Sequence, residues 1–233
     1  MEEITEDRPR IKFKAKWVGS IDPQSISPCC KEELNRLAQL QNMLESVGVI
    51  PILNDGLLGG NCALKPLHNT GGESIFVSKS GKQPGLPMAE HDFVKIAYFD
   101  RDDWSVEYES HTNSCYRPSS DTPLHVAALQ RSNSHHGWSR EPRVVVHGHA
   151  LADGKGLEVA TNAGLPISTA ATLFSTPEDL YALEELFIKY PYPQYRCYIR
   201  RGHGFFMLAD NIDEAWHILN MTLIPLLRES QGE

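Results

Sequence analysis

The stretch VVVHGHA, Val144 to Ala150, runs three β-branched residues directly into two histidines that stand one residue apart. In a β-strand, residues i and i+2 point to the same face and lie about 7 Å apart. His147 and His149 are therefore expected to lie side by side at the end of a buried strand. Polar groups are unfavourable to bury unless they have partners. The pair therefore predicts a site that both imidazoles share.

Segments with helical and strand periodicity alternate on both sides of this strand. Apolar residues recur at spacings of three and four in residues 31–47, which is typical of one face of a helix. Capping signals predict three further helices, one that begins at Ser120 or Asp121 and two within residues 175–190 and 211–229. Strands are predicted in residues 75–77, 92–100, 143–148, 194–201 and 204–210.

The predicted strands are often apolar on both faces, which indicates a sheet covered by helices on two sides. We therefore predict a three-layer α/β/α sandwich, with the strand order left open. In the helix predicted at 175–190, Ser175 or Thr176 is the expected N-cap and Glu178 the expected capping-box partner. The mixed charges of the N-terminus predict a partly ordered arm over residues 1–30, and residues 31–233 are predicted to form a single domain.

The composition is that of an ordinary globular protein. The 233 residues carry a formal charge of −8 and are 41% hydrophobic. The acidic balance and the lack of a basic stripe argue against a nucleic acid partner. No apolar run approaches the roughly 18 residues of a membrane span, and the first residues contain no apolar core of a secretory signal. The five cysteines include no CxxC pair, which argues against a thiolate zinc site and is typical of a reducing cytosol. We therefore expect a cytoplasmic protein with no membrane partner.

His203, in the stretch RRGHGFF, is the best candidate for a third member of the histidine group. It lies between Gly202 and Gly204, where one predicted strand ends and the next begins. Glycine at both positions allows the backbone to turn sharply. Three imidazoles that leave one coordination position open are typical of a catalytic rather than a structural zinc site. The alternative, histidines that are hydrogen-bonded without a metal, is left open by the spacing alone.

Two further motifs contain the donor groups that bind an anion. The stretch SSDT, residues 119–122, lies at a predicted helix N-terminus, where hydroxyl groups and backbone N–H groups favour phosphate. The stretch NTGGESIFVSKSG, residues 69–81, offers glycines and serines in two turns. Ordinary helix capping and an ordinary hairpin turn are the alternative explanations. Lys79 and Lys82 are near enough in sequence to reach a phosphate, although most surface lysines have no such role.

The order of these motifs along the chain resembles that of the class II aldolase/adducin family. The likeness covers roughly residues 31–228, and SSDTPLH, HGH and GHG are its most specific parts. Among the members it is strongest to the fuculose-phosphate aldolases, while SSDTP also resembles the ribulose-phosphate 4-epimerases. The resemblance implies an α/β/α sandwich around a mostly antiparallel sheet, assembled as a homotetramer with sites between subunits.

The resemblance also implies a role for each motif. It places one zinc ion per chain on His147, His149 and His203, with Asp121 as the active-site acid and as a further zinc ligand when no substrate is bound. It implies that the phosphate of a sugar substrate binds to glycines and serines, namely Gly71, Gly72, Ser74, Ser80, Gly81, Ser119 and Ser120. The implied reaction is retro-aldol cleavage of a ketose 1-phosphate, of the fuculose 1-phosphate type, to dihydroxyacetone phosphate and an aldehyde.

The chain departs from the family at positions that choose among its reactions. Gly72 stands where the aldolases have the asparagine of a Gly-Asn turn, and Asp121 where they have glutamate and the epimerases aspartate. The second acid of the epimerases falls near Phe174, and the tyrosine of the aldolases near Ala170. A sugar-phosphate 4-epimerase, a methylthioribulose-phosphate dehydratase and a non-catalytic adducin-like module therefore stay open as alternatives. A tyrosine of the stretch YPYPQY, residues 190–195, is a candidate replacement for the missing proton donor.

Overall fold

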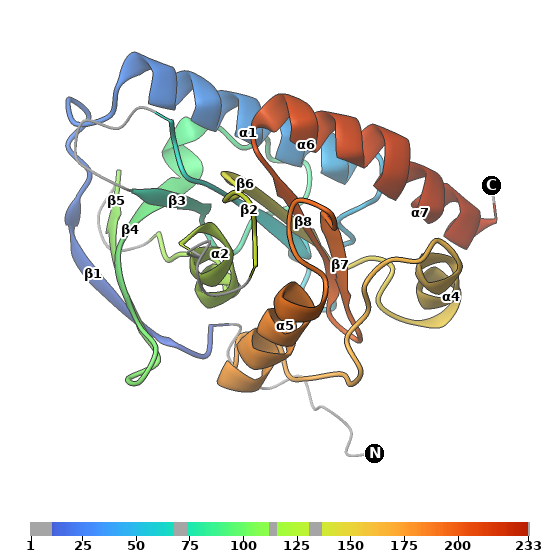
Figure 1. The fold of residues 1–233 in the computed structure, drawn as a ribbon. Helices are drawn as coiled ribbons and strands as arrows, with labels where there is room; N and C mark the ends of the chain where they lie inside the picture. The colour runs from blue at the N-terminus through green and yellow to red at the C-terminus, as the bar shows by residue number, and fades with distance from the viewer. Residues whose placement is uncertain (1–10, 68–73, 112–115, 131–136, 233) are drawn as a thin grey trace.

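An eight-stranded sheet forms the centre of the molecule (Figure 1). The structure is a computed structural model and describes residues 11–67, 74–111, 116–130 and 137–232. The strand order is β1-β5-β4-β3-β2-β6-β8-β7, and all neighbours are antiparallel except β1 and β5. The strands span Lys14–Ser20 (β1), Gly60–Leu64 (β2), Ile75–Ser78 (β3), Phe93–Asp100 (β4), Ser105–Ser110 (β5), Val144–Gly148 (β6), Cys197–Arg200 (β7) and Gly204–Ala209 (β8).

Helices cover both faces of this sheet, as the apolar strands predicted. α1, α6, the π-helical turn η2 and α7 lie on one side, and α2 and α5 lie on the other (Figure 1). α4 packs against α7. The predicted three-layer α/β/α sandwich is therefore confirmed, and no helix in the described ranges is both long and apolar enough to cross a membrane. The helical segments are α1 (Pro28–Ser46), η1 (Glu90–Asp92), α2 (Thr122–Leu129), α4 (Gly154–Asn162), α5 (Pro177–Lys189), α6 (Ile212–Ile218), η2 (Leu219–Leu223) and α7 (Ile224–Gln231).

The alternation of side chains along β6 explains how the layers form. Val144 and Val146 belong to the core that contains the apolar residues of α1, α6 and α7. Val145 belongs to the core that contains those of α2 and α5. His147 is two residues further along, so the period of the strand directs it to the same face as Val145. The alternation along β6 thus directs this histidine to the face of the sheet that α2 and α5 cover.

The four predicted helices are present, and their ends show how they form. α1 begins earlier than predicted because the Ser27 side chain accepts a hydrogen bond from the Cys30 N–H. α5 is capped by Thr176, whose hydroxyl group accepts from the Asp179 N–H. The predicted capping-box acid, Glu178, is wrong, because the third residue of this helix is Asp179 and its carboxylate has other partners. The C-terminal segment that was predicted as one helix is divided by η2 into α6 and α7.

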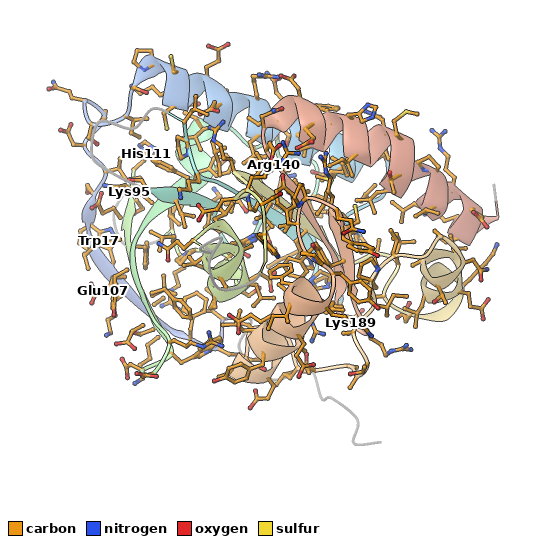
Figure 2. All side chains as sticks on the ribbon, in the orientation of Figure 1. Trp17, Lys95, Glu107, His111, Arg140 and Lys189 are labelled. Atoms are coloured by element: carbon orange, nitrogen blue, oxygen red, sulfur yellow. The ribbon has the colours of Figure 1, made fainter. Side chains whose placement is uncertain are left out.

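Strands β1 and β5 and helix α4 have no counterpart among the predicted elements. β1 lies in the segment predicted as an N-terminal arm and forms the edge of the sheet. Most of its side chains are exposed, so no alternation of apolar residues marks it. Figure 2 shows Trp17 of β1 and Glu107 of β5 at this outer edge. β2 lies in the middle of the sheet, although its glycine-rich approach predicted only turns and short extended pieces.

Candidate metal centre

Four side chains from distant parts of the chain meet beside the ends of β6 and β8. His147 is in β6, His149 directly follows that strand, and His203 lies in the turn between β7 and β8. Asp121 is the N-cap residue of α2. One possible ligand atom from each of the four lies within 4.8 Å of the others, and all four residues are buried except His149, which is partly exposed. The residues predicted as metal ligands are therefore together, and the group is able to hold a metal ion.

Glycines allow the strands to bring these side chains together. A Cβ atom on Gly204 would lie 2.1 Å from the carbonyl oxygen of Gly148, and one on Gly148 would lie 2.7 Å from the ring of Phe205. β6 and β8 therefore approach this closely only because both positions lack a side chain. Gly202 has a φ of +72°, in the left-handed region that favours glycine, immediately before His203. The sharp turn predicted for the GHG stretch is confirmed.

Contacts on the outer side of the rings orient two of the imidazoles. His147 donates from Nδ1 to the carbonyl oxygen of Phe205 at 2.7 Å, and His203 Nδ1 lies 3.0 Å from Asp179 Oδ2. Their Nε2 atoms face Asp121, at 3.5 and 3.3 Å from its carboxylate oxygens. Among the described residues, both Nε2 atoms and Asp121 Oδ1 are buried without a hydrogen-bond partner, and so are His203 Nδ1 and Asp179 Oδ2, whose contact is an ion pair. Metal-bound imidazoles commonly direct one ring nitrogen to such a carbonyl or carboxylate and the other to the metal, so this donor set fits a divalent ion.

The charges around this group favour a cation. Burial raises the pKa of Asp121, but the imidazoles of His147 and His203 lower it well below its usual range, so the residue is a carboxylate. Burial lowers the pKa of His203, but Asp179 and Asp121 outweigh this and raise it to about 10. Burial lowers the pKa of His147 to about 4 against the attraction of Asp121. Two buried carboxylates thus flank His203 and stabilise positive charge at this site.

A pair of polar side chains that sequence analysis missed holds Asp121 from the side of β2. Asn61 donates from Nδ2 to Asp121 Oδ2 at 2.6 Å, and its Oδ1 accepts from Nε2 of His125. Burial lowers the pKa of His125 to about 3, and the attraction of Asp121 only partly opposes this, so the ring is neutral. Asn61 lies opposite His147 in the pairing of β2 with β6, and His125 lies one helical turn after Asp121. Only the second of these relations is visible in the sequence.

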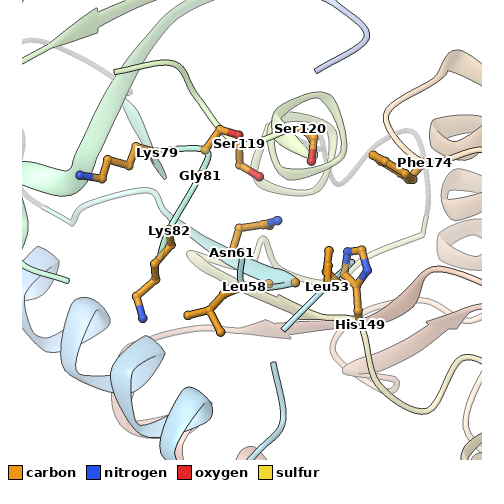
Figure 3. Close-up of a pocket in the computed structure, with 13 residues that line it drawn as sticks. Leu53, Leu58, Asn61, Lys79, Gly81, Lys82, Ser119, Ser120, His149 and Phe174 are labelled. Carbon is orange, nitrogen blue, oxygen red and sulfur yellow. The ribbon is translucent and has the colours of Figure 1, made fainter. Parts of the chain in front are cut away.

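An open pocket lies next to this group (Figure 3). His149 and Phe174 line one part of it, and the loops at residues 79–82 and 119–120 line another. Two backbone hydrogen bonds, from Ser80 to Arg117 at 2.8 Å and from Ser119 to Ser78 at 3.0 Å, join these loops. The lining includes four of the residues predicted to bind phosphate, namely Ser80, Gly81, Ser119 and Ser120.

The other residues predicted to bind phosphate are Ser74, Gly71 and Gly72. Ser74 is buried just before β3 and is not in the pocket lining, while Gly71 and Gly72 lie outside the described residues. A Gly-Asn pair does line the pocket, but at Gly60 and Asn61. The resemblance placed the asparagine of this pair at Gly72, so Asn61 was not predicted. The GGN stretch that enters β2 is the signal that would have found it.

Lys79 and Lys82 also line the pocket, but acidic side chains hold their ammonium groups. Lys79 Nζ lies 2.6 Å from Asp92 Oδ1, and Lys82 forms an ion pair with Glu45. Figure 3 shows both lysine side chains directed away from His149. On the side of the metal group, the described lining therefore offers hydroxyl, amide and backbone groups to an anion.

Phe174 occupies the region where the resemblance placed the second acid of the epimerases. It lines the pocket, and its ring centroid is 5.9 Å from that of His203. Tyr192 is buried and its hydroxyl group has an acidic partner, whereas the rings of Tyr190 and Tyr195 meet edge to face with centroids 5.1 Å apart. These three tyrosines, all described by the structure, are not among the residues that line the pocket.

Comparison with known proteins identifies the fold. No family model and no curated protein matches the sequence. A sugar-phosphate aldolase from Thermotoga maritima matches with a TM-score of 0.58 and 10% identity, over 86% of this chain and 94% of that one. An L-fuculose-1-phosphate aldolase from Thermus thermophilus matches with a TM-score of 0.52 and 18% identity, over 85% and 91% of the chains. The N-terminal class II aldolase domain of a Thermoplasma acidophilum protein matches with a TM-score of 0.52 and 17% identity, over 91% and 96%. The chain therefore has the fold of the class II aldolases, the group that its motifs resemble.

Proposed function

We propose that the protein is a metal-dependent aldolase that cleaves a ketose 1-phosphate, of the fuculose 1-phosphate type, into dihydroxyacetone phosphate and an aldehyde. The observation that carries the proposal is the meeting of three imidazoles and one carboxylate beside a pocket lined by serine and glycine. Solved structures of similar fold include a sugar-phosphate aldolase and an L-fuculose-1-phosphate aldolase. As the resemblance implies, we further propose a cytoplasmic homotetramer.

The metal in this proposal is zinc, one ion per chain. His147, His149 and His203 would hold it, and Asp121 would complete the set when no substrate is bound. Three imidazoles with one exchangeable position are the pattern of a catalytic zinc site. When bound there, the ion supplies an electrophile that polarises a ketose carbonyl and a neighbouring hydroxyl group.

Asp121 is proposed to accept the hydroxyl proton that starts the cleavage. The adjacent carbon–carbon bond then breaks, and its electron pair moves towards the ketose carbonyl group. Asn61 holds Oδ2 of Asp121, whereas Oδ1 has no hydrogen-bond partner among the described residues. A positioned base of this kind contributes about 10²–10⁴-fold to a rate.

The two loops of the pocket are proposed to hold the substrate phosphate. Ser80, Gly81, Ser119 and Ser120 would supply hydroxyl and backbone N–H donors. Fixing the phosphate fixes the distance between the reacting carbons and Asp121, which is an orientation effect. Because the nearby lysines have acidic partners, we expect these donors rather than ammonium groups to carry phosphate binding.

Metal analysis combined with a substrate panel tests this function. The full chain is purified without added zinc, its metal content is measured, and ketose phosphates are assayed for release of triose phosphate. Asp121→Asn serves as the active-site variant, and Asp210→Asn, a change remote from the pocket lining, serves as the control. Triose phosphate release that Asp121→Asn removes and Asp210→Asn leaves intact would support the proposal.

Other outcomes distinguish the alternatives. Inversion at carbon 4 or loss of water from a bound substrate, without cleavage, would replace the aldolase with an epimerase or a dehydratase. Phe174 already argues against the epimerase, because it lies where that reaction would need its second acid. Protein that binds no transition metal under any loading condition would be an adducin-like module instead.

A further inference from the structure

We propose that Asp179, held in place by Arg200, is a positioning residue that directs His203 towards the metal ion. The proposal rests on the proposed metal site and names a residue that the sequence motifs do not contain. It assigns a purpose to a buried polar network on the outer side of the histidine group, away from Asp121. Asp179, Arg200 and His203 are all at most 3% exposed.

The two carboxylate oxygens of Asp179 have separate partners. Oδ1 accepts from Arg200 Nε at 3.0 Å, from Arg200 Nη2 at 2.8 Å and from the hydroxyl group of Thr172 at 2.9 Å. Oδ2 lies 3.0 Å from His203 Nδ1. The three donors on Oδ1 fix the rotation of the carboxylate, and Oδ2 is left to face the imidazole.

This contact determines which nitrogen of His203 is available to a ligand. A ring whose Nδ1–H faces a carboxylate presents its Nε2 lone pair on the opposite side. That Nε2 atom lies 3.3 Å from Asp121 Oδ1, inside the group of four candidate ligands. His147 has a hydrogen bond at the same ring nitrogen, to the neutral carbonyl oxygen of Phe205. Asp179 thus gives His203 an ion-pair contact at the position where His147 has a neutral hydrogen bond.

A purely structural ion pair explains less of this arrangement. Buried ion pairs often add little to stability compared with apolar residues of the same size. Arg200 and Thr172 would satisfy Oδ1 equally well if His203 were absent. Oδ2, in contrast, has the imidazole as its ion-pair partner, and that imidazole belongs to the candidate metal ligands.

The affinity of the protein for Zn²⁺ tests the proposal independently of catalysis. The metal-stripped full chain is titrated against a chelating dye, and the absorption spectrum of the Co²⁺-loaded protein reports the geometry of the site. Asp179→Asn should weaken metal binding about 10- to 100-fold and change the Co²⁺ spectrum, as the loss of such an outer contact does elsewhere. Asp210→Asn, which removes an acid that contacts Tyr192 and Arg140 instead, should leave both readouts unchanged.

A second variant covers the case in which Asp179→Asn disturbs the fold. That single change leaves the buried charge of Arg200 without its partner, so the double variant Asp179→Leu/Arg200→Met replaces the whole ion pair with apolar side chains. Circular dichroism establishes that it is folded, and its metal affinity should still be weakened. A folded double variant that binds Zn²⁺ as tightly as the unchanged protein would overturn the role of Asp179 but not the proposed function. An unchanged protein that binds no Zn²⁺ would overturn the proposed function with it.

Discussion

Two buried aspartates lie on opposite sides of the same imidazole and have different partners. Asp121, at the start of α2, faces Nε2 of His203, and Asp179, in the first turn of α5, faces Nδ1. Asp179 Oδ1 has three donors, two of them from a guanidinium group. Asp121 has only the neutral amide of Asn61 on Oδ2. The remaining oxygen of each aspartate faces His203 and has no hydrogen-bond partner among the described residues.

This difference explains how the same residue type serves two purposes in one site. Three hydrogen bonds and a buried counter-charge hold Asp179 in one orientation, so it is suited to fixing another side chain. The Asp121 carboxylate accepts one neutral hydrogen bond, from Asn61, so it is able to exchange partners between a metal, a proton and a substrate. Position at a helix N-terminus favours a carboxylate in both cases. The neighbouring side chains, rather than the helices, therefore separate the two roles.

Replacing the imidazole between the two aspartates should have the largest effect. His203→Ala removes one candidate ligand and the contact that links Asp179 to the site. We expect the variant to lose its bound metal and all triose phosphate release while it stays folded, because Asp179 keeps Arg200 and Thr172 as partners. Metal content of the purified protein measures this, with His217→Ala on the exposed face of α6 as control. A His203→Ala protein that retains a full complement of metal would break the comparison.

The comparison predicts different responses of the two aspartates to added metal. Asp121→Asn should lower the turnover rate about 10²–10⁴-fold even when metal is saturating, because it removes the base itself. Asp179→Asn should recover most of the turnover rate at saturating metal, because it weakens only the contact that orients His203 and therefore lowers only the metal affinity. Rates measured across a zinc titration separate the two. Equal residual rates at saturation would show that the two carboxylates are not distinct in function.

The free energy of unfolding should depend more on the partner of Asp179 than on the partner of Asp121, whereas the turnover rate depends more on Asp121. Arg200→Met should lower the free energy of unfolding by about 3–5 kcal/mol, because it removes the buried guanidinium group that pairs with Asp179. Asn61→Ala removes one neutral partner of Asp121 and should lower it by about 1–3 kcal/mol. Urea unfolding of the metal-free proteins measures both, with the exposed Arg140→Met as a control that should change little. A smaller loss for Arg200→Met than for Asn61→Ala would contradict this ranking.

The residues of the site that could be predicted from sequence are those whose relation is local. His147 and His149 lie together because side chains alternate along a strand with a period of two. The glycines on either side of His203 indicate a turn. The layers of the fold follow from strands that are apolar on both faces. These local patterns do not depend on which strands are neighbours. They can therefore be recognised in a chain that no family model matches.

Asn61 and Asp179 could not be found in the same way. Asn61 reaches Asp121 because β2 lies beside β6, and strand order is not encoded in local periodicity. Asp179 was passed over in favour of Glu178 because both are acids in the first turn of a helix, where capping is the usual explanation. Only the packing of α5 against β7 shows that Asp179 faces His203. β1 was missed for a related reason, since an exposed edge strand has no apolar face to show.

His125 is neutral in the folded protein and hydrogen bonds to Asn61, the partner of Asp121. Its titration should make the stability of the protein depend weakly on pH. Burial lowers the pKa of His125 from 6.5 to about 3, and its Nε2 hydrogen bonds to Asn61. The unfolded chain therefore binds the proton more readily than the folded one, so stability falls as the pH drops from 6.5 towards 3. At pH 5 the loss from this one group should be about 2 kcal/mol relative to neutral pH.

Comparing the metal-free protein with His125→Gln isolates the contribution of His125 to the pH dependence of stability. A glutamine amide is able to donate to Asn61 Oδ1, but it does not titrate, so its contribution to stability should be constant between pH 7 and pH 5. The difference in free energy of unfolding between the two proteins should therefore change by about 2 kcal/mol in favour of the variant as the pH falls. Parallel pH profiles would mean that His125 is protonated in the folded protein. Asp121 would then have a second buried cation nearby, and the contrast with Asp179 would lose its electrostatic basis.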